Sequence, residues 1–187
     1  MRLFWEKGFS GVSLPELEER TGLSRSSLYN SFGSKQQIFE QSLQRYREEK
    51  CEQICHPLEA GDRGLDDLLA FIDSAYAQFT SKSGGSGCLL VNCMVEFGGT
   101  DETVSRHASE HLDRLRKALS STLMRAVALG EISTEERAEK VDLLLALLLG
   151  ICVATRAGLA PTQVGKLVQA MRVQIRGWTK HPAKSRG

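Results

Sequence analysis

The chain has 187 residues, 41% of them hydrophobic and 25% charged, and its 24 basic and 23 acidic side chains give a formal net charge of +1. This length accommodates one small domain and a larger domain with its own core. The balanced charge excludes a protein that coats nucleic acid without sequence preference. The start, MRLFWEKG, lacks the extended apolar run and cleavage site of a secretion signal, so we expect a cytoplasmic protein.

The composition favours helices throughout the chain. Only four prolines occur, few segments alternate with a period of two, and long stretches are rich in Leu, Ala, Glu, Arg and Lys. We therefore predict an all-α fold, with a small N-terminal domain over residues 1–46 and a larger helical domain over residues 47–187.

The segment over residues 8–35, GFSGVSLPELEERTGLSRSSLYNSFGSK, predicts two short helices joined by a tight turn. Ser13 and Glu16 have the spacing of a capping box, which starts a helix that ends at Gly22. Ser24 then caps a second helix through about residue 31. This is the pattern of a helix-turn-helix, whose second helix enters the major groove of DNA.

The two helices divide into an internal and an external face. The side chains expected inside are Leu14, Leu17, Leu23, Leu28 and Phe32. Those expected to point outward from the second helix are Arg25, Ser26, Ser27, Tyr29 and Asn30.

The outward side chains have the chemistry of groove binding. Arginine bonds the guanine edge, asparagine bonds adenine, and tyrosine and lysine reach phosphate oxygens. Residues 20–39 contain three basic side chains and no acid, which indicates a local docking surface. The alternative is an ordinary capped helical corner without a ligand.

These residues resemble the N-terminal domain of the TetR family of bacterial transcription regulators. The resemblance covers residues 3–39, in FWEKGF and then VSLPELEERTGLSRSSLYNSFGSKQQIF. It implies phosphate contacts by Ser13, Tyr29 and Lys35, and base contacts by Arg25, Ser26, Ser27 and Asn30. Family members usually carry a longer first helix, so we expect the first helix here to be truncated and native upstream residues to be missing.

The remaining helices follow from caps, glycines and apolar spacing. Ser34 caps a helix towards about Cys55, closed by Pro57 and Gly61, and the resemblance implies that this helix links the two domains. Further helices are predicted over residues 65–79, 101–129, 134–157 and 161–179, the third of them starting at a capping box of Ser133 and Glu136. The loop SKSGGSG over residues 81–87 is flexible by composition.

Residues 143–154, LLLALLLGICVA, are apolar on every face. Twelve residues are too few to cross a bilayer, for which about 20 are needed, so no membrane contact is expected. Together with the last helix they predict a homodimer whose subunits each contribute two helices to a four-helix bundle, as the resemblance also implies. The alternative is a buried helix of a monomer.

The middle of the chain is the expected place for a small-molecule inducer. The side chains expected around a cavity include Tyr76, Phe79, Met94, Phe97, His111 and Leu115, with Asn92 and Glu96 as further polar anchors. Each of these is also compatible with plain core. The resemblance implies that a ligand bound here moves the two DNA-binding units out of groove spacing, and by linkage inducer and DNA weaken each other's binding equally.

The five cysteines do not suggest a disulfide framework in an intracellular chain. Cys88 follows SGGSG and is expected at a helix start, where the dipole lowers a thiol pKa, so Cys88, with Cys93, is a candidate redox sensor. Cys51, Cys55 and His56 are a weaker candidate for a soft metal.

The main alternative from another class is a zinc-dependent hydrolase. His107, Glu110 and His111 have the H-x-x-E-H spacing, but no acidic residue after Asp142 offers a third ligand from the last helices. We expect no enzyme, no cofactor and no resident metal. The predicted function is a ligand-responsive regulator, a repressor that leaves a palindromic operator in double-stranded DNA when its inducer binds.

Overall fold

The computed structural model describes residues 1–80 and 87–179, without the side chain of Cys51. The predicted all-α fold is confirmed, since the described residues form helices and no strand. The helices are α1 (Arg2–Lys7), α2 (Leu14–Thr21), α3 (Arg25–Phe32), α4 (Lys35–Tyr46), the π-helix η1 (Arg47–Cys51), α5 (Glu52–Ala60), α6 (Leu65–Thr80), α7 (Leu89–Phe97), α8 (Glu102–Ala128), α9 (Arg137–Arg156) and α10 (Pro161–Arg176). Most of the glycine-rich loop predicted to be flexible, residues 81–86, lies outside the described residues.

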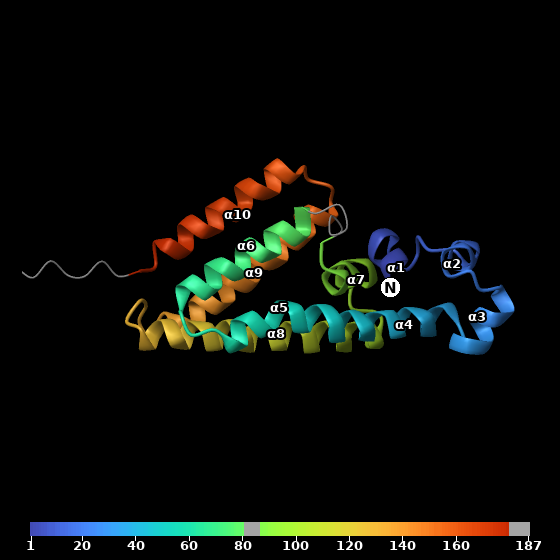
Figure 1. Ribbon diagram of the computed structural model, residues 1–187, viewed down its shortest axis with the longest axis horizontal. Coiled ribbons are helices and arrows are strands. Elements are labelled where there is room, and N and C mark those ends of the chain that lie inside the picture. Colours follow the sequence, from blue (N-terminus) through green and yellow to red (C-terminus); the bar gives the residue numbers. More distant parts are fainter. Residues whose placement is uncertain (81–86, 180–187) are drawn as a thin grey trace, which may run out of the picture.

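Two parts of the molecule are visible in Figure 1. The head, α1–α4, lies at one end, and the body, α5, α6 and α8–α10, forms a bundle at the other end. Helix α7 lies between them and packs on α8 and α9 of the body and on α1 and α4 of the head.

The helix that links head and body is longer than predicted. Helices α4, η1 and α5 follow one another without a break, and Pro57 lies inside α5 instead of closing it. The end of α5 is held by α8, because Thr122 Oγ1 donates to the Leu58 carbonyl at 3.0 Å and the Arg125 guanidinium donates to the same oxygen. These contacts and the buried Leu58 side chain outweigh the backbone donor that the proline removes.

The predicted capping box before α9 is half formed. Ser133 Oγ and N–H donate to the Glu136 carboxylate, at 2.7 and 3.0 Å, but the helix begins only at Arg137. A turn over residues 134–136 separates the two.

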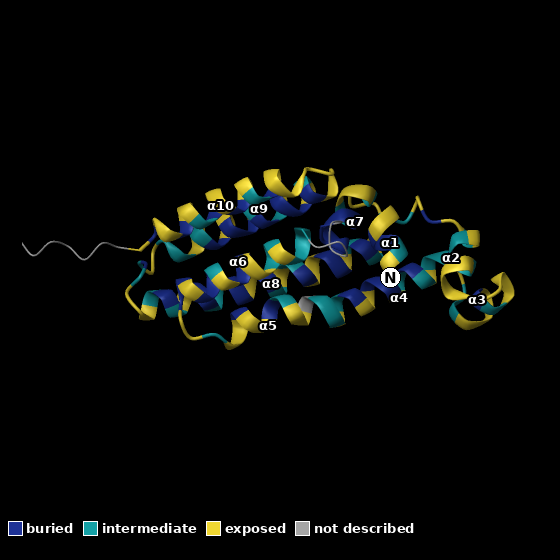
Figure 2. Cartoon of the chain, turned by 45° about the horizontal axis from the view of Figure 1, so that its top comes forward, coloured by how far each residue is buried: buried dark blue, intermediate teal, exposed yellow. Residues whose placement is uncertain are grey.

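Two hydrophobic cores divide the described residues. The body core contains buried side chains of α5, α6, α8, α9 and α10, such as Leu68, Leu119 and Leu144. The head core contains Phe4, Leu28 and Phe39, and it continues through the first half of α7 to Cys152 of α9. Figure 2 shows buried positions on the inner sides of the helices and many exposed positions on α2 and α3.

Candidate nucleic-acid interface and buried cavity

The turn between α2 and α3 has both predicted caps. Ser13 Oγ accepts from the Glu16 N–H at 3.4 Å while the Glu16 carboxylate accepts from the Ser13 N–H at 2.8 Å, which closes the capping box. Gly22 ends α2 in the left-handed conformation at φ 70°, which glycine adopts without strain, and Ser24 Oγ accepts from the Ser27 N–H at 3.2 Å. The orientation of α3 against α2 is therefore fixed by local hydrogen bonds.

Helix α3 is anchored by one buried side chain, Leu28, and its other face is open. Leu23 is 37% exposed, so the prediction that it packs inside is wrong. The predicted contact residues Arg25, Ser26, Tyr29 and Asn30 are exposed and Ser27 is half-buried. The Arg25 guanidinium lies 5.7 Å from the centre of the Tyr29 ring.

Ser13 and Lys35 stand at the starts of α2 and α4, where unpaired backbone N–H groups favour an anion. The Lys35 ammonium lies 4.4 Å from the centre of the Phe9 ring, which positions this cation beside the first turn of α4. The seven predicted contact residues therefore lie on three consecutive short elements of the head. Nothing in the fold buries any of the seven.

A cavity of about 50 Å³ lies on the seam between the two cores. Of the predicted ligand-binding residues, Phe79, His111 and Leu115 line it. The other lining residues are Trp5, Tyr46, Ile54, Phe71, Ala75, Gln78, Cys88, Val91, Leu112, Leu148, Leu149 and Cys152. The head core and the body core thus each supply part of its wall.

Three predicted ligand residues lie elsewhere. Phe97 packs on Phe9 and Phe39, with ring centres 5.6 and 5.7 Å apart, at the junction of α7 with the head. Tyr76 turns its hydroxyl towards Gly165 of α10, and Met94 lies on a side of α7 that does not reach the cavity. The apolar spacing of α6 and α7 gave no indication of which of their faces meets α8.

Cys88 is the buried polar centre of the cavity. Its Sγ lies 3.8 Å from Nε2 of His111, and Cys88 is the residue directly before α7, without a side-chain capping hydrogen bond. Burial opposes ionisation of the thiol, but the hydrogen bond and charge of His111, the Tyr46 hydroxyl and the Val91 N–H hold the pKa of Cys88 below its ordinary value. Cys88 therefore has the surroundings of an activated thiol.

The neighbouring thiols differ from Cys88. Burial, with the charges of Glu96 and Cys88, raises the pKa of Cys93 to about 12. Burial also raises the pKa of Cys152, whose sulfur accepts the Cys88 N–H. Of the two predicted redox residues, Cys88 thus has a lowered thiol pKa and Cys93 a raised one.

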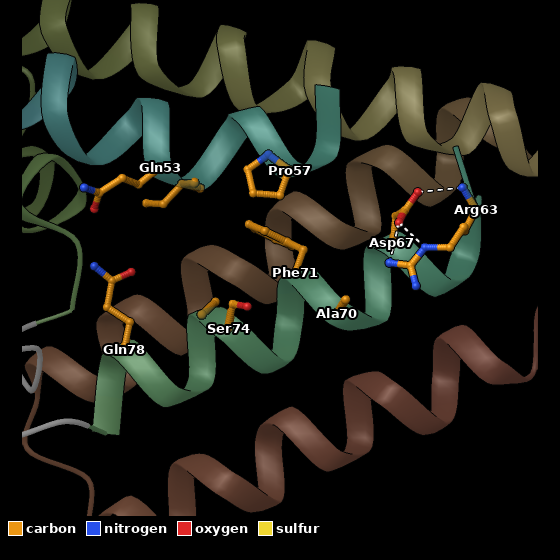
Figure 3. A pocket seen from close by; sticks show the side chains of 10 residues that line it. Gln53, Pro57, Arg63, Asp67, Ala70, Phe71, Ser74 and Gln78 are labelled. Atoms are coloured by element: carbon orange, nitrogen blue, oxygen red, sulfur yellow. Dashed lines mark hydrogen bonds and ion pairs between the residues drawn. The ribbon is translucent and has the colours of Figure 1, made fainter. Parts of the chain in front are cut away.

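A second, more open cleft of about 170 Å³ lies between α5 and α6. Figure 3 shows Gln53 and Gln78 on opposite sides of one end, and Asp67 holding Arg63 at the other. Phe71 and Gln78, with Ile54 and Ala75, line both this cleft and the Cys88 cavity. These side chains form the wall that separates the two spaces.

The candidate metal sites are not assembled. Cys55 is buried while the adjacent His56 is exposed, and the Cys51 side chain lies outside the described part of the chain. His111 faces Cys88, and Glu110 pairs with Arg47 at the surface. The described residues contain no group of three or more His, Cys, Asp or Glu side chains that suits a metal ion.

The buried His107 stays neutral. Its Nδ1 has no hydrogen-bond partner among the described residues. Burial and the charges of Arg47 and Arg106 hold the pKa of His107 below its ordinary value.

The predicted dimer-forming helices carry an apolar groove of about 670 Å³. Its lining residues are Leu143, Ala146, Leu147, Gly150, Ile151, Leu167, Ala170, Met171 and Gln174, all from α9 and α10. Leu143 and Leu167 are 37% and 42% exposed, so the surface of these two helices offers apolar area for a second copy. Within the described ranges, no helix is both long and apolar enough to cross a membrane.

Two family models match most of the chain. The model described as "Bacterial regulatory proteins, tetR family" matches residues 1–41, and the model described as "Tetracyclin repressor-like, C-terminal domain" matches residues 64–171. The first covers the whole α2–α3 turn, and the second covers all residues that line the cavity except those of α1, α4 and α5.

Individual relatives agree with the family models. The HTH-type transcriptional repressor ComR of Escherichia coli strain K12 is 29% identical over 185 residues, which cover 95% of this chain and 84% of ComR. The solved structure of E. coli NemR in its reduced form has a TM-score of 0.80 at 21% identity, covering 97% of this chain and 93% of NemR. A cysteine mutant of CifR, solved with a 26-base-pair operator, has a TM-score of 0.79 at 22% identity, covering 95% and 92%.

The cavity was only partly predictable. The sequence analysis found Cys88, Phe79, His111 and Leu115, but it missed Trp5 and Tyr46, which come from the head. Trp5 lies 82 residues before its hydrogen-bond partner Gly87. No local pattern connects residues so far apart, so nothing in the sequence could reveal this contact.

Proposed function

Because the chain belongs to the TetR family of bacterial transcription regulators, we propose which of its residues bind DNA, which form the dimer and which receive the signal. The chain is a ligand-responsive, DNA-binding repressor of this family and not an enzyme. TetR-family regulators bind operator DNA and are typically dimers. The residues assigned to these tasks are given below. The protein acts in the cytoplasm, where operator DNA is located.

Helix α3 reads the bases. Arg25, Ser26, Ser27 and Asn30 face the groove, while Ser13, Tyr29 and Lys35 hold phosphates on either side. The single observation that supports this assignment is the exposed polar face of α3, oriented by complete caps and anchored from below by Leu28. A rigidly held short helix with free polar side chains is what groove reading requires.

The apolar groove on α9 and α10 serves as the homodimer interface. A two-fold dimer places two copies of α3 about 34–36 Å apart, or a multiple of that spacing, on a palindromic operator. When a small molecule separates the head core from the body core in each subunit, this spacing changes and the repressor leaves the operator.

Selection of bound duplexes from a random DNA pool tests the DNA-binding assignment. We expect enrichment of a two-fold symmetric motif at moderate salt. Arg116→Gln is the matched control, because Arg116 lies on α8 and pairs with Asp142, far from the head. Recovery of no symmetric motif by the parent protein would contradict the assignment.

The inducer acts in the Cys88 cavity. A space of about 50 Å³ is too small for a drug-sized ligand, but movement of Phe71 and Gln78 joins it to the α5–α6 cleft of about 170 Å³. The combined site has an inner end whose mostly apolar walls enclose Cys88 and His111, and a polar outer end at Gln53 and Ser74. An uncharged small molecule with one polar end fits this arrangement.

A second candidate signal is covalent modification of the Cys88 thiol. The observation that favours it is the 3.8 Å Cys88–His111 contact inside the cavity. Among the similar solved structures, NemR is in a reduced form and CifR carries cysteine substitutions.

Iodoacetamide is a direct probe of this candidate. The Cys88 thiolate attacks the methylene carbon, the C–S bond forms, the C–I bond breaks and iodide leaves, while His111 holds the proton released by the thiol. We expect modification, located by mass spectrometry, to weaken operator binding in the parent and not in Cys88→Ser. Equal weakening in both proteins would reject Cys88 as the sensor.

A further inference from the structure

Two aromatic side chains of the head touch the segment that begins α7, and we propose that Trp5 and Tyr46 are the coupling residues that transmit a change at Cys88 to the DNA-binding face. This inference rests on the proposed role of the Cys88 cavity in sensing the signal. Trp5 and Tyr46 carry the signal from Cys88 to the head, and no local sequence pattern indicates this role.

Trp5 joins the first helix of the head to the residue before Cys88. Its Nε1–H donates to the Gly87 carbonyl at 2.9 Å, and its ring lines the cavity. The same helix is held from the body, because the Arg156 guanidinium donates to the carbonyls of Trp5 and Glu6 at 3.2 and 2.7 Å. Helix α1 is therefore tied both to the Gly87–Cys88 segment and to α9, so a displacement of that segment strains the position of α1.

Gly87 cannot absorb such a displacement by itself. Its φ is +69°, and a Cβ built on it would lie 2.6 Å from the Cys152 carbonyl oxygen. The backbone at this position is thus pressed against α9 on one side and hydrogen-bonded to Trp5 on the other. A group added to Cys88 therefore cannot push the segment towards α9, and it presses instead on the Trp5 ring of α1.

Tyr46 supplies the second contact. Its hydroxyl hydrogen-bonds the Cys88 sulfur, and its ring meets the Trp5 ring edge-on, with centres 5.1 Å apart and planes at 78°. Tyr46 is the last residue of α4 and directly precedes η1. A π-helix is rare and frequently lies at a functional site, so we place the point at which α4 changes direction at η1.

Helix α7 also connects Cys88 to the turn before the helix-turn-helix of α2 and α3. At its other end the Glu96 carboxylate accepts the backbone N–H groups of Phe9 and Ser10, at 3.0 and 2.8 Å, in the turn that leads to α2. A shift of α7 at Cys88 moves this turn as well as α1. Both ends of α7 are therefore tied to the head, while its flank packs on the body.

The test compares operator affinity before and after complete modification by iodoacetamide, using the duplex recovered by selection. Trp5→Phe keeps the ring and removes the donor, and Trp178→Phe is its matched control in the body core. Tyr46→Phe removes only the hydroxyl, and Tyr76→Phe is its control on α6. Complete modification is verified by mass spectrometry, so differences in reaction rate do not enter the comparison.

We expect modification to weaken operator binding of the parent and both controls by at least about tenfold, within the usual range of allosteric coupling. In Trp5→Phe and Tyr46→Phe the same modification should weaken binding by less than about threefold, with unmodified affinity retained. If Trp5 and Tyr46 only stabilised the fold, their substitution would lower operator affinity and would not remove the effect of the modification. Weakening equal to the parent in both variants would overturn the inference.

A separate measurement distinguishes failure of the inference from failure of the thiol proposal. If Cys88 resists iodoacetamide, the thiol proposal fails, and Cys88→Met then serves as a permanent enlargement of the same side chain. The inference predicts that Cys88→Met weakens operator binding, and that it does so less in the Trp5→Phe background. Additive effects of the two substitutions would contradict coupling through Trp5.

The control protein also offers an optical readout. The chain has two tryptophans, so Trp178→Phe leaves Trp5 as the only tryptophan, which is excited selectively at wavelengths that tyrosine does not absorb. We expect a change in its fluorescence when Cys88 is modified, because the indole contacts Gly87 and Tyr46. An unchanged spectrum after complete modification would contradict movement at Trp5.

Discussion

The head and the body of this protein are packed in different ways. The head core depends on aromatic contacts between short helices, such as the Phe4, Phe9 and Phe39 rings, whose centres lie 4.9–6.3 Å apart. The body core depends on aliphatic side chains along long helices, with α8 alone extending over 27 residues. A core of short elements has little stability of its own and depends on its neighbour.

The consequence is that the head is completed by a helix from the rest of the chain. Helix α7 supplies Leu89 and Leu90 to the head core, and the Cys88 cavity lies where this core meets the body core. A signal received on that seam acts on the packing of the DNA-binding unit directly. The comparison shows how the signal site that we propose on this seam is connected to the head through shared packing.

Phe39→Ala is expected to have the largest effect, because it removes the ring at the centre of the head core. Phe39 is fully buried, and truncation of a buried aromatic side chain costs about 3–5 kcal/mol of unfolding free energy. Urea denaturation followed by circular dichroism measures this loss. Leu123→Ala is the control in the body core. If the cores unfold independently, Phe39→Ala will instead produce a separate early transition with the body unaffected.

Arg25→Ala tests the exposed face without touching either core. We expect a loss of about 1–3 kcal/mol in operator binding, confined to one base-pair position, with stability unchanged. Fluorescence anisotropy with single-base variants of the operator measures it. An equal loss on every sequence would mean that Arg25 contacts phosphate and not a base.

His111→Gln tests the chemistry of the seam. Since His111 lowers the thiol pKa, its loss raises that pKa, and the thiolate fraction at pH 7 falls by about tenfold for each pKa unit. We expect slower reaction of Cys88 with iodoacetamide near neutral pH, with the difference shrinking at higher pH as both thiols ionise. A pH profile identical to that of the parent would exclude a role for His111 in activating the thiol.

Lys35→Ala should have the smallest effect. Removing one phosphate contact weakens binding to all duplexes alike and flattens the slope of log affinity against log salt by about one. Titrations at several salt concentrations measure the slope. An unchanged slope would place the Lys35 ammonium on Phe9 in the complex as well, away from the DNA.

Sequence reasoning succeeded where the determinants are local. The caps at Ser13 and Ser24 and the turn at Gly22 lie within a few residues of the helices they control, so the helix-turn-helix could be predicted almost to the residue. The same reasoning failed at Pro57, because contacts from α8 decide where α5 ends. It also failed at Trp5 and Tyr46, whose positions depend on contacts between distant segments.

Hydrogen exchange with and without modification of Cys88 by iodoacetamide tests most directly whether the seam joins the signal to the head. Peptides from α1, α4 and α10 report on the two cores in one experiment. The account predicts faster amide exchange in α1 and α4 after modification, with α10 unchanged. Faster exchange confined to α6 and α8, with α1 and α4 unaffected, would contradict it.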